Sequence, residues 1–277
     1  PRHDRRCVVN SAGTVASSAA SIAAADRASA TKVTSVTSGP SEHGASFDSQ
    51  RRTARTAGAL YLSIFVIAPF VYFYVPGELF HDDAATTAAE ISANTGLFTA
   101  GMIAETVIVG IEVALAGLLW RLFRPVSQSL ALSSSLARVG EAFIQAVNVV
   151  LAGAVLIAVD RGGLSGLDDG ERAEIVGFLV DTIGFGVMVW GLLFGLHLLL
   201  LGVLVRRSEL MPAWIGSLLL LASVGYFAQS YGHIVDTDLD GFFENLVVVL
   251  SVPGELAFAG YLLFRGVRTP ASTALER

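Results

Sequence analysis

Residues 192–205 read LLFGLHLLLLGVLV, with His197 as the single ionisable side chain. They close an apolar run at about 175–205, and a helix that rises ~1.5 Å per residue needs ~20 apolar residues to cross the hydrocarbon of a bilayer. Comparable runs lie at about 57–76, 97–120, 130–159, 175–205, 212–234 and 244–264. The sequence therefore predicts an all-α fold, an integral membrane bundle of six transmembrane helices.

The composition agrees with a membrane location. Hydrophobic residues make up 53% of the chain and charged residues 15%, with a mean hydropathy of +0.63, whereas soluble domains carry about 25% charged residues. The net charge is −6, and no basic patch of the kind that binds nucleic acid is present. The expected location is the cell membrane, with the lipid bilayer as a partner and no nucleic acid.

The two sets of run ends differ in charge. Arginines flank one set of ends, and these are Arg51, Arg52, Arg55, Arg121, Arg124, Arg206, Arg207, Arg265 and Arg268. Acids dominate the opposite set, and these include Asp82, Asp83, Asp160, Asp168, Asp169, Asp236, Asp238 and Asp240. Because short cytoplasmic loops carry the excess of positive residues, both termini are predicted to be cytoplasmic.

Three segments follow from the composition along the chain. Residues 1–50 are rich in Ser, Ala and Thr, cannot bury enough apolar surface to offset chain entropy, and are predicted to be disordered. Residues 51–268 form the predicted six-helix domain, and 269–277 a short cytoplasmic tail. Cys7 is the single cysteine, which excludes an internal disulfide and a CxxC metal site.

Two acidic connections predict local structure. Asp83 precedes AATTAAE at 84–90, an N-cap residue followed by helix formers, which predicts a short surface helix. The acidic stretch 167–171 lacks the alternating oxygens and the distal glutamate of a calcium-binding loop, so a solvated loop is predicted there.

Ionisable groups inside membrane helices usually face the bundle interior and are candidates for function. In the run at 97–120, Glu105 and Glu112 stand seven residues apart, within about 20° of each other on one helix face. In the run at 130–159 a polar stripe follows three- and four-residue steps, made of Ser134, Arg138, Glu141, Gln145 and Asn148. Both faces are predicted to point inward. The stripe is interpreted either as a functional site or as a clamp that only packs helices.

Depth, counted from the arginine-flanked ends, groups these residues into two layers. The inner layer is a predicted buried polar cluster of Glu112, Arg138, Glu141, His197 and Glu255. Its carboxylates outnumber its arginine, so at least one is expected to hold a proton at neutral pH, because burial and like charges disfavour the ionised form. The second is a predicted outer polar layer of Glu105, Asn148, Asp181, Gln229 and His233. His233 lies near a run end, where an interfacial role is the alternative.

Aromatic residues and prolines add further expectations. Pro253 lies inside the last run and predicts a kink two residues before Glu255. Aromatic side chains near run ends are interpreted as the belts that lie at membrane interfaces, and these are Tyr61, Tyr72, Tyr74, Trp120 and Trp214.

Several cofactor chemistries find no support in the residues. No lysine lies in any run, which excludes a retinal Schiff base, and glycine-rich phosphate loops and serine-hydrolase motifs are missing. The histidines outside the tail, His81, His197 and His233, fall at different depths, so no three-histidine zinc site is expected. A weak outer site of His81, His233 and Asp181 stays open. No cofactor and no metal are predicted.

Several segments together resemble a family. They are RTARTAGALYL at 52–62, WGLLFGLHLLLLG at 190–202, MPAWIG at 211–216, PGEL at 253–256 and FRG at 264–266. Over about residues 50–268 the chain resembles the bacterial and archaeal family of domain of unknown function 4386. The resemblance implies a multi-span membrane protein and brings no established activity. His197 and Glu255 fall inside the matching segments.

Two hypotheses from different classes result. The first is a proton-coupled transporter of a small solute or ion, in which Glu112, Glu141 and Glu255 titrate, Arg138 is the counter-ion or an anion contact, and His197 is a relay. The alternative is a non-catalytic scaffold, sensor or complex subunit, and a membrane-embedded metal hydrolase is third. An enzyme is therefore not the favoured class. A path from solvent to Glu112 or Glu255 would favour transport, whereas a closed polar cluster would favour a scaffold.

Overall fold

The chain forms long helices joined by short connections. A computed structural model describes residues 41–160, 164, 166–235 and 240–268. Within these ranges the chain is helical, and no strand occurs. The elements are α2 (Ser41–Pro69), the π-helical turn η1 (Phe70–Tyr74), α3 (Val75–Leu79), α4 (Ala84–Ala93), α5 (Thr95–Phe123), α6 (Gln128–Val159), α7 (Asp169–Arg207), α8 (Ala213–Val235) and α9 (Asp240–Phe264).

The helices confirm the all-α membrane fold. Among the described residues, six helical stretches are long and apolar enough to cross a bilayer, and they are Asp48–Leu79, Thr95–Phe123, Gln128–Val159, Asp169–Arg207, Ala213–Val235 and Gly241–Phe264. The predicted disorder of residues 1–40, the tail at 269–277 and Cys7 lie outside the described residues. Residues 41–50, which were assigned to the disordered tail, already belong to α2. The cytoplasmic location of the termini stays a prediction.

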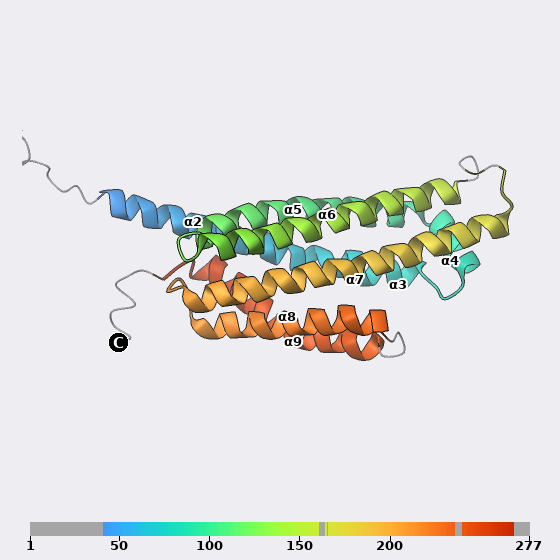
Figure 1. Ribbon diagram of the computed structural model, residues 1–277. Coiled ribbons are helices and arrows are strands. Elements are labelled where there is room, and N and C mark those ends of the chain that lie inside the picture. Colours follow the sequence, from blue (N-terminus) through green and yellow to red (C-terminus); the bar gives the residue numbers. More distant parts are fainter. Residues whose placement is uncertain (1–40, 161–163, 165, 236–239, 269–277) are drawn as a thin grey trace, which may run out of the picture. The chain divides into compact units, whose positions relative to one another are not determined.

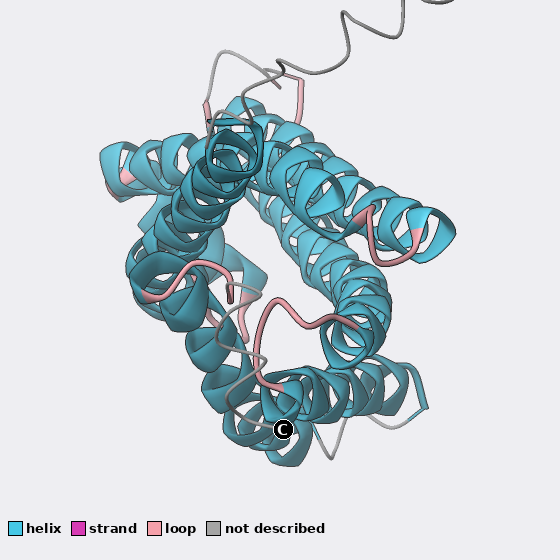
Figure 2. Cartoon of the chain, turned by 90° about the vertical axis from the view of Figure 1, so that its left-hand side faces the viewer, coloured by secondary structure: helices cyan, strands magenta, loops and turns pink. Residues whose placement is uncertain are grey.

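Neighbours in sequence are neighbours in space. η1 and α3 pack on α5, α5 on α6, α6 on α7, α7 on α8, and α8 on α9. The first and last spans also meet, because the ring of Tyr61 in α2 lies 5.9 Å from the ring of Phe258 in α9. The six spans therefore close into a ring, which Figure 2 shows end-on.

The closure of this ring depends on glycine. A Cβ atom at Gly58 of α2 would lie 2.8 Å from the carbonyl oxygen of Ala259 in α9, with the backbone nitrogen of Leu263 closer still. Real Cβ atoms do not approach backbone this closely, so only glycine lets α2 and α9 lie at this separation.

The two ends of the ring carry opposite charge. The α5–α6 and α7–α8 connections lie at the left of Figure 1 and bear the arginines, whereas α4 and the α6–α7 connection lie at the right. We call the left-hand end of the ring the arginine-rich end. Its arginines are Arg51, Arg52, Arg55, Arg121, Arg124, Arg206, Arg207, Arg265 and Arg268. We call the right-hand end the acidic end. Its acids are Asp82, Asp83, Asp160, Asp168, Asp169, Glu171 and Glu174.

The larger apolar core fills the arginine-rich half. It brings together the middle of α2 and the first turns of α6 and α8 with the last turns of α5, α7 and α9, and includes Leu115, Leu119, Phe123, Leu198, Leu201, Leu204, Ile215, Leu219, Phe258 and Leu262. We call this the inner core. A smaller core joins η1, α3, α4, α5, α6 and α7 near the acidic end, and includes Val75, Leu79, Ile91, Phe98, Val155 and Val176.

A proline changes the path of the first span. α2 ends at Pro69, which has no backbone N–H to donate, and the next residues form the wider π-helical turn, in which Val75 N–H bonds the carbonyl of Phe70. Pro253 lies inside α9, which continues through it. The first span predicted at about 57–76 is present within Asp48–Leu79, with a π-helical turn after Pro69.

Both acidic connections begin helices. The predicted surface helix after Asp83 is confirmed as α4. The stretch 167–171 is the start of α7, because the Asp168 side chain accepts a hydrogen bond from Glu171 N (2.8 Å) and the Glu171 side chain accepts one from Asp168 N (3.0 Å). This capping box corrects the prediction of a solvated loop.

The cap of α4 yields a prediction about the local stability of this helix. Asp83 accepts hydrogen bonds from Thr86 N (2.8 Å) and Thr86 Oγ1 (2.7 Å), and these bonds hold the pKa of its carboxyl below the ordinary value. The resulting stabilisation is present above that ordinary value and is lost as the pH falls through the lowered folded pKa. We expect Asp83→Ala to speed hydrogen exchange at the Thr86 amide at neutral pH, whereas Asp82→Ala leaves it unchanged. Equal exchange in both variants would contradict the capping role.

Candidate functional site

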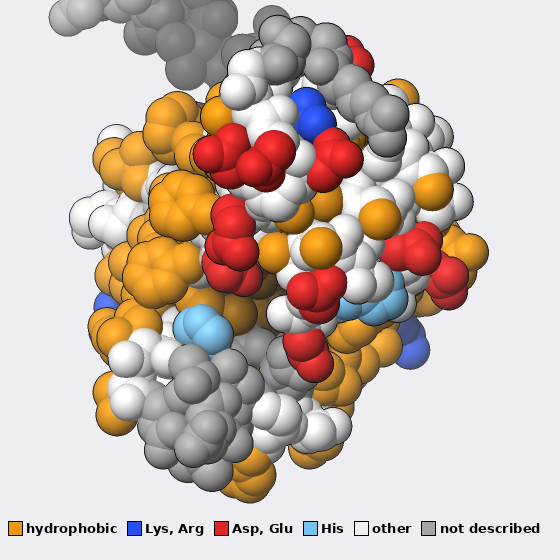
Figure 3. Space-filling view, turned by 90° about the vertical axis from the view of Figure 1, so that its right-hand side faces the viewer, with side chains coloured by type: hydrophobic (Ala, Val, Ile, Leu, Met, Phe, Trp, Pro, Cys, Tyr) orange, Lys and Arg blue, Asp and Glu red, His pale blue; other side chains and the backbone are white. Residues whose placement is uncertain are grey.

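A large cavity occupies the acidic half of the ring. Its volume is about 1130 Å³, above the ~300–1,000 Å³ typical of small-molecule pockets. All six spans contribute to its wall, from Tyr61 in α2 to Glu255 in α9. Figure 3 shows the acidic end, with Asp and Glu side chains around a recess near the centre of the face. Towards the other end the cavity stops at the inner core.

Two charged side chains, Glu112 and Arg138, line the bottom of the cavity, and Glu141 lies behind them. Arg138 Nη2 lies 3.7 Å from Glu112 Oε1, and Arg138 Nη1 lies 3.9 Å from Glu141 Oε1. Arg138 is 1% exposed and Glu141 0%, so water does not screen these charges. α6 turns its polar stripe inward here, and Glu112 approaches from α5. The guanidinium also lies over the rings of Tyr61 (4.9 Å) and Phe194 (5.5 Å), an arrangement that stabilises a cation.

Glu255 is held by two tyrosines from different helices. Tyr61 Oη donates to Glu255 Oε2 (3.1 Å) and Tyr226 Oη donates to Glu255 Oε1 (3.2 Å). Both carboxylate oxygens therefore have a donor, which orients the group at the cavity wall. Tyr61 connects Glu255 to the ion pairs, because its ring lies over Arg138.

His197 lies within the bundle but not on the cavity wall. Its Nδ1 atom is 2.9 Å from the carbonyl oxygen of Ser134 and 3.0 Å from Ser134 Oγ. A carbonyl only accepts, so Nδ1 carries the proton and Nε2 keeps its lone pair. Nε2 is buried and has no hydrogen-bond partner among the described residues. The imidazole stacks on Phe194 at 6.0 Å and joins α6 to α7.

The five residues of the buried polar cluster thus lie in one region. Glu112, Arg138 and Glu255 line the cavity, whereas Glu141 and His197 lie behind them. All five are buried. The depth count placed them on one level because the helices run side by side along the same axis.

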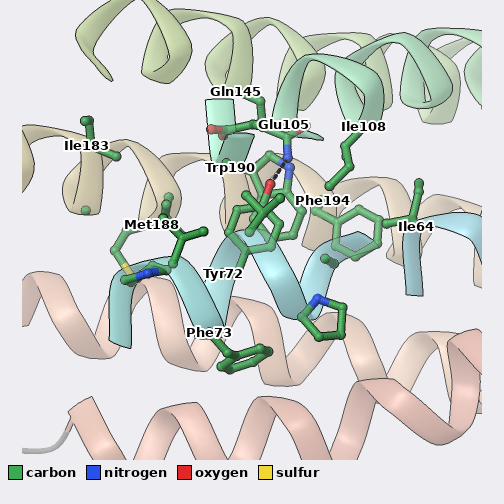
Figure 4. Close-up of a pocket in the computed structure, with 18 of the residues that line it drawn as sticks. Ile64, Tyr72, Phe73, Glu105, Ile108, Gln145, Ile183, Met188, Trp190 and Phe194 are labelled. Carbon is green, nitrogen blue, oxygen red and sulfur yellow. Dashed lines mark hydrogen bonds between the residues drawn. The ribbon is translucent and has the colours of Figure 1, made fainter. Parts of the chain in front are cut away.

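The outer polar layer is partly assembled. Glu105, Asp181, Gln229 and His233 line the cavity. Asn148 does not, because its Nδ2 donates to the carbonyl of Ile183 (3.3 Å) and its side chain packs on Gly186 of α7. Gln145, one turn earlier on α6, reaches the cavity in its place and donates to Tyr72 Oη (Figure 4).

Two tyrosines assigned to an aromatic belt belong to the cavity. Tyr61 is 2% exposed and bonds Glu255, because α2 starts well before residue 57 and places Tyr61 deep in the bundle. Tyr72 lies in η1, where the π-helical turn directs its ring to Trp190, 6.4 Å away (Figure 4). The belt interpretation of Tyr61 and Tyr72 was wrong. Trp214 of α8 is 57% exposed, as a belt residue would be.

The chain offers no metal centre in the part that the structure describes. No three His, Cys, Asp or Glu side chains there lie close enough together to hold an ion. His81, His233 and Asp181, left open as a weak ligand set, are not brought together, so the hydrolase alternative has no ligand set in the described part of the chain.

A ring of six apolar helices around a buried polar centre defines a multi-span membrane protein. Residues 56–266 match the family described as Domain of unknown function (DUF4386), and the chain belongs to this family. It is also similar to an uncharacterized protein of Archaeoglobus fulgidus, with 29% identity over 164 residues that cover 57% of this chain and 79% of the relative. No solved structure matches the chain.

Proposed function

We propose that the protein is a proton-coupled transporter of a small solute. The observation that carries this proposal is the cavity, which leads from the acidic end to Glu112, Arg138 and Glu255 in the middle of the ring. A bundle that served only as a scaffold would have no need to keep so large a space beside buried charges, since unfilled space costs packing energy.

The arrangement supports one half of an alternating-access cycle. The cavity is open towards the acidic end, and the inner core closes the arginine-rich end with packed side chains such as Phe123, Leu201 and Phe258. If the arginine-rich end faces the cytoplasm, as the positive-inside rule favours, this state is open to the outside. Transport then requires the inner core to part while the acidic half closes.

The carboxylates supply the proton coupling. Glu112 and Glu141 pair with one arginine, and Glu255 is linked to it through Tyr61, so the cluster carries excess negative charge when all three carboxylates are ionised. Taking up one proton lowers this excess, and releasing it restores a negative charge at the cavity wall. Arg138 holds two of the carboxylates in place. His197 is the proposed proton relay, because the lone pair on its Nε2 atom can accept a proton.

A second function is favoured by the position of Glu141 and His197. Both are buried behind the cavity wall and connect helices, Glu141 through Arg138 and His197 through Ser134. A buried polar network of this kind also specifies one helix arrangement. The alternative is therefore a scaffold, sensor or subunit in which the cluster only determines packing.

Glu255→Gln separates the two functions. The assay uses proteoliposomes that contain a pH-sensitive dye. Amines, carboxylates and neutral solutes are added one at a time, and we expect the wild type to move protons in response to at least one of them. The variant should lose this response, because the glutamine side chain does not ionise and so cannot take up and release a proton, while its melting temperature stays close to that of the wild type.

Glu78→Gln is the matched control, because Glu78 lies in VPGEL at 75–79 and Glu255 in VPGEL at 252–256. Glu78 is exposed at the acidic end, so its variant should respond like the wild type. A wild-type protein that moves no protons with any solute, or a Glu255→Gln variant that is as active as wild type, would count against transport.

A further inference from the structure

The charge that faces the cavity is predominantly negative. Four acids contribute to its wall, and they are Glu105, Glu112, Asp181 and Glu255. Arg138 is the one arginine or lysine among the described residues that line the cavity. Its charge is offset from two sides, because Glu112 and Glu141 both lie within 4.0 Å of the guanidinium. The acids at the mouth add to the negative field, which attracts cations.

Unpartnered acceptors lie at the bottom of the cavity. Glu112 is 2% exposed; its Oε1 faces Arg138, and its Oε2 is buried with no N–H or hydroxyl donor among the described residues, although the Glu141 carboxyl lies within hydrogen-bond reach of the Glu112 carboxyl. Gln145 Oε1 is also buried without a hydrogen-bond partner among the described residues. The other end of this amide, Nε2, donates to Tyr72 Oη. Buried acceptors are costly when unsatisfied. A ligand with an N–H group would satisfy them.

The donors in the same region do not favour an anion. Arg138 Nε and Nη1 also lack hydrogen-bond partners. However, the rings of Tyr61 and Phe194 cover the guanidinium, and Nη1 is directed at Glu141. The indole N–H of Trp190 is unpartnered as well, but a neutral donor does not select for charge. An anion would also lie close to Glu112 and Glu255.

Aromatic rings form the wall above these acceptors. Trp190 stacks on Phe194 at 5.1 Å and on Tyr72 at 6.4 Å, and it meets Tyr226 edge-on at 5.9 Å. Figure 4 shows Tyr72, Trp190 and Phe194 gathered next to Gln145. Aromatic faces attract cations, most strongly where water is excluded.

Exposed apolar side chains also line the cavity. Phe73 in η1, Phe185 in α7 and Val248 in α9 line the cavity and are 68%, 53% and 46% exposed. These exposed side chains supply an apolar surface for the body of a ligand.

We infer that the cavity binds a lipophilic organic cation, an ammonium group on an apolar body. Glu112 Oε2 accepts the ammonium N–H, Gln145 Oε1 is the second acceptor, and the rings of Tyr72, Trp190 and Phe194 surround the apolar body. This inference names the solute of the proposed transporter and rests on that function. The ammonium and the exchanged proton then compete for the same carboxylates, so that one leaves when the other binds.

The test compares three probes of similar size in titration calorimetry with the purified full chain in detergent. They are 2-phenylethylammonium, 3-phenylpropionate and 2-phenylethanol. We expect the ammonium to bind and to release protons, and the anion and the alcohol to show no saturable heat. Binding of 3-phenylpropionate in preference to the ammonium would show that Arg138 selects an anion and would overturn the inference. Absence of binding by all three would overturn it too.

Variants test the assigned contacts. Glu112→Gln should weaken ammonium binding about 10–100-fold, because a hydrogen bond to a charged group is lost, and Glu78→Gln should leave it unchanged. Trp190→Leu keeps every charge and should also weaken binding, whereas Trp190→Phe should restore most of it. Ammonium binding of wild-type strength in both Glu112→Gln and Trp190→Leu would overturn the assigned site. If Glu112→Gln does not fold, the comparison of Trp190→Leu with Trp190→Phe tests the site instead.

The results also separate this inference from the proposed function. Ammonium binding without solute-driven proton movement in proteoliposomes would leave the cation site standing and reject transport. Proton movement driven by other solutes, with no ammonium binding, would leave transport standing and reject the cation.

Discussion

We expect replacement of Arg138 by leucine to lower the free energy of unfolding by about 3–5 kcal/mol, the usual cost of removing one partner from a buried ion pair. Arg138 is 1% exposed and is the cation that faces both Glu112 and Glu141. Without it, two buried carboxylates lose their counter-ion. The measurement is reversible unfolding in mixed detergent, followed by helical circular dichroism.

A triple variant shows whether charge is the cause. Arg138→Leu combined with Glu112→Gln and Glu141→Gln removes all the charge together and should regain a large part of the lost stability. Arg55→Leu is the control for loss of an arginine, because Arg55 is exposed on α2 at the arginine-rich end. If Arg138→Leu unfolds at the same denaturant concentration as Arg55→Leu, the cluster does not stabilise the bundle.

Gly58→Ala has the second largest expected effect. The new methyl group would lie 2.8 Å from the carbonyl oxygen of Ala259, and a backbone atom of a packed helix cannot rotate away. α2 and α9 must separate, so we expect a loss of about 1–3 kcal/mol of unfolding free energy, as for other overpacked sites. The separation also pulls Tyr61 away from Glu255, so fluorescence or infrared signals from that tyrosine should change with stability.

Gly117→Ala is the matched control, for which the expected change in stability has the opposite sign. Gly117 lies in α5, is exposed, and has no atom within 4 Å of a built Cβ. Alanine is about 1 kcal/mol better than glycine in a helix interior, so this variant should be as stable as the wild type or more so. Equal behaviour of the two alanine variants would show that α2 and α9 do not pack as closely as the structure has them.

The buried polar cluster was predictable from the sequence to an unusual degree. Arg138, Glu141 and Gln145 repeat at helical spacing, so their common inward face follows from the 3.6-residue period alone. Glu112 and Glu255 were placed near them by counting residues from the arginine-flanked ends. That count works in a membrane bundle because the helices share one axis and one thickness.

The tyrosines of the cluster were missed for a physical reason. Tyr61 and Tyr226 come 194 and 29 positions from Glu255 in sequence, and a tyrosine in an apolar helix gives no sign of which neighbour its hydroxyl will meet. Pro69 was a usable signal for Tyr72, since a proline inside a run predicts a local break. The direction in which the break turns the ring depends on the packing of η1 against α5.

The sequence by itself determined the class of the protein, the number of spans, the opposite charge of the two ends and the inward face of each polar helix. These are properties of hydropathy, charge and period, which act within one segment at a time. Only the tertiary structure decided that the first and last spans meet through Gly58, that Tyr61 and Tyr226 hold Glu255, and that a cavity remains above Arg138. Those features depend on how the shapes of separate helices fit together, and residual space between helices is not a property of any one of them.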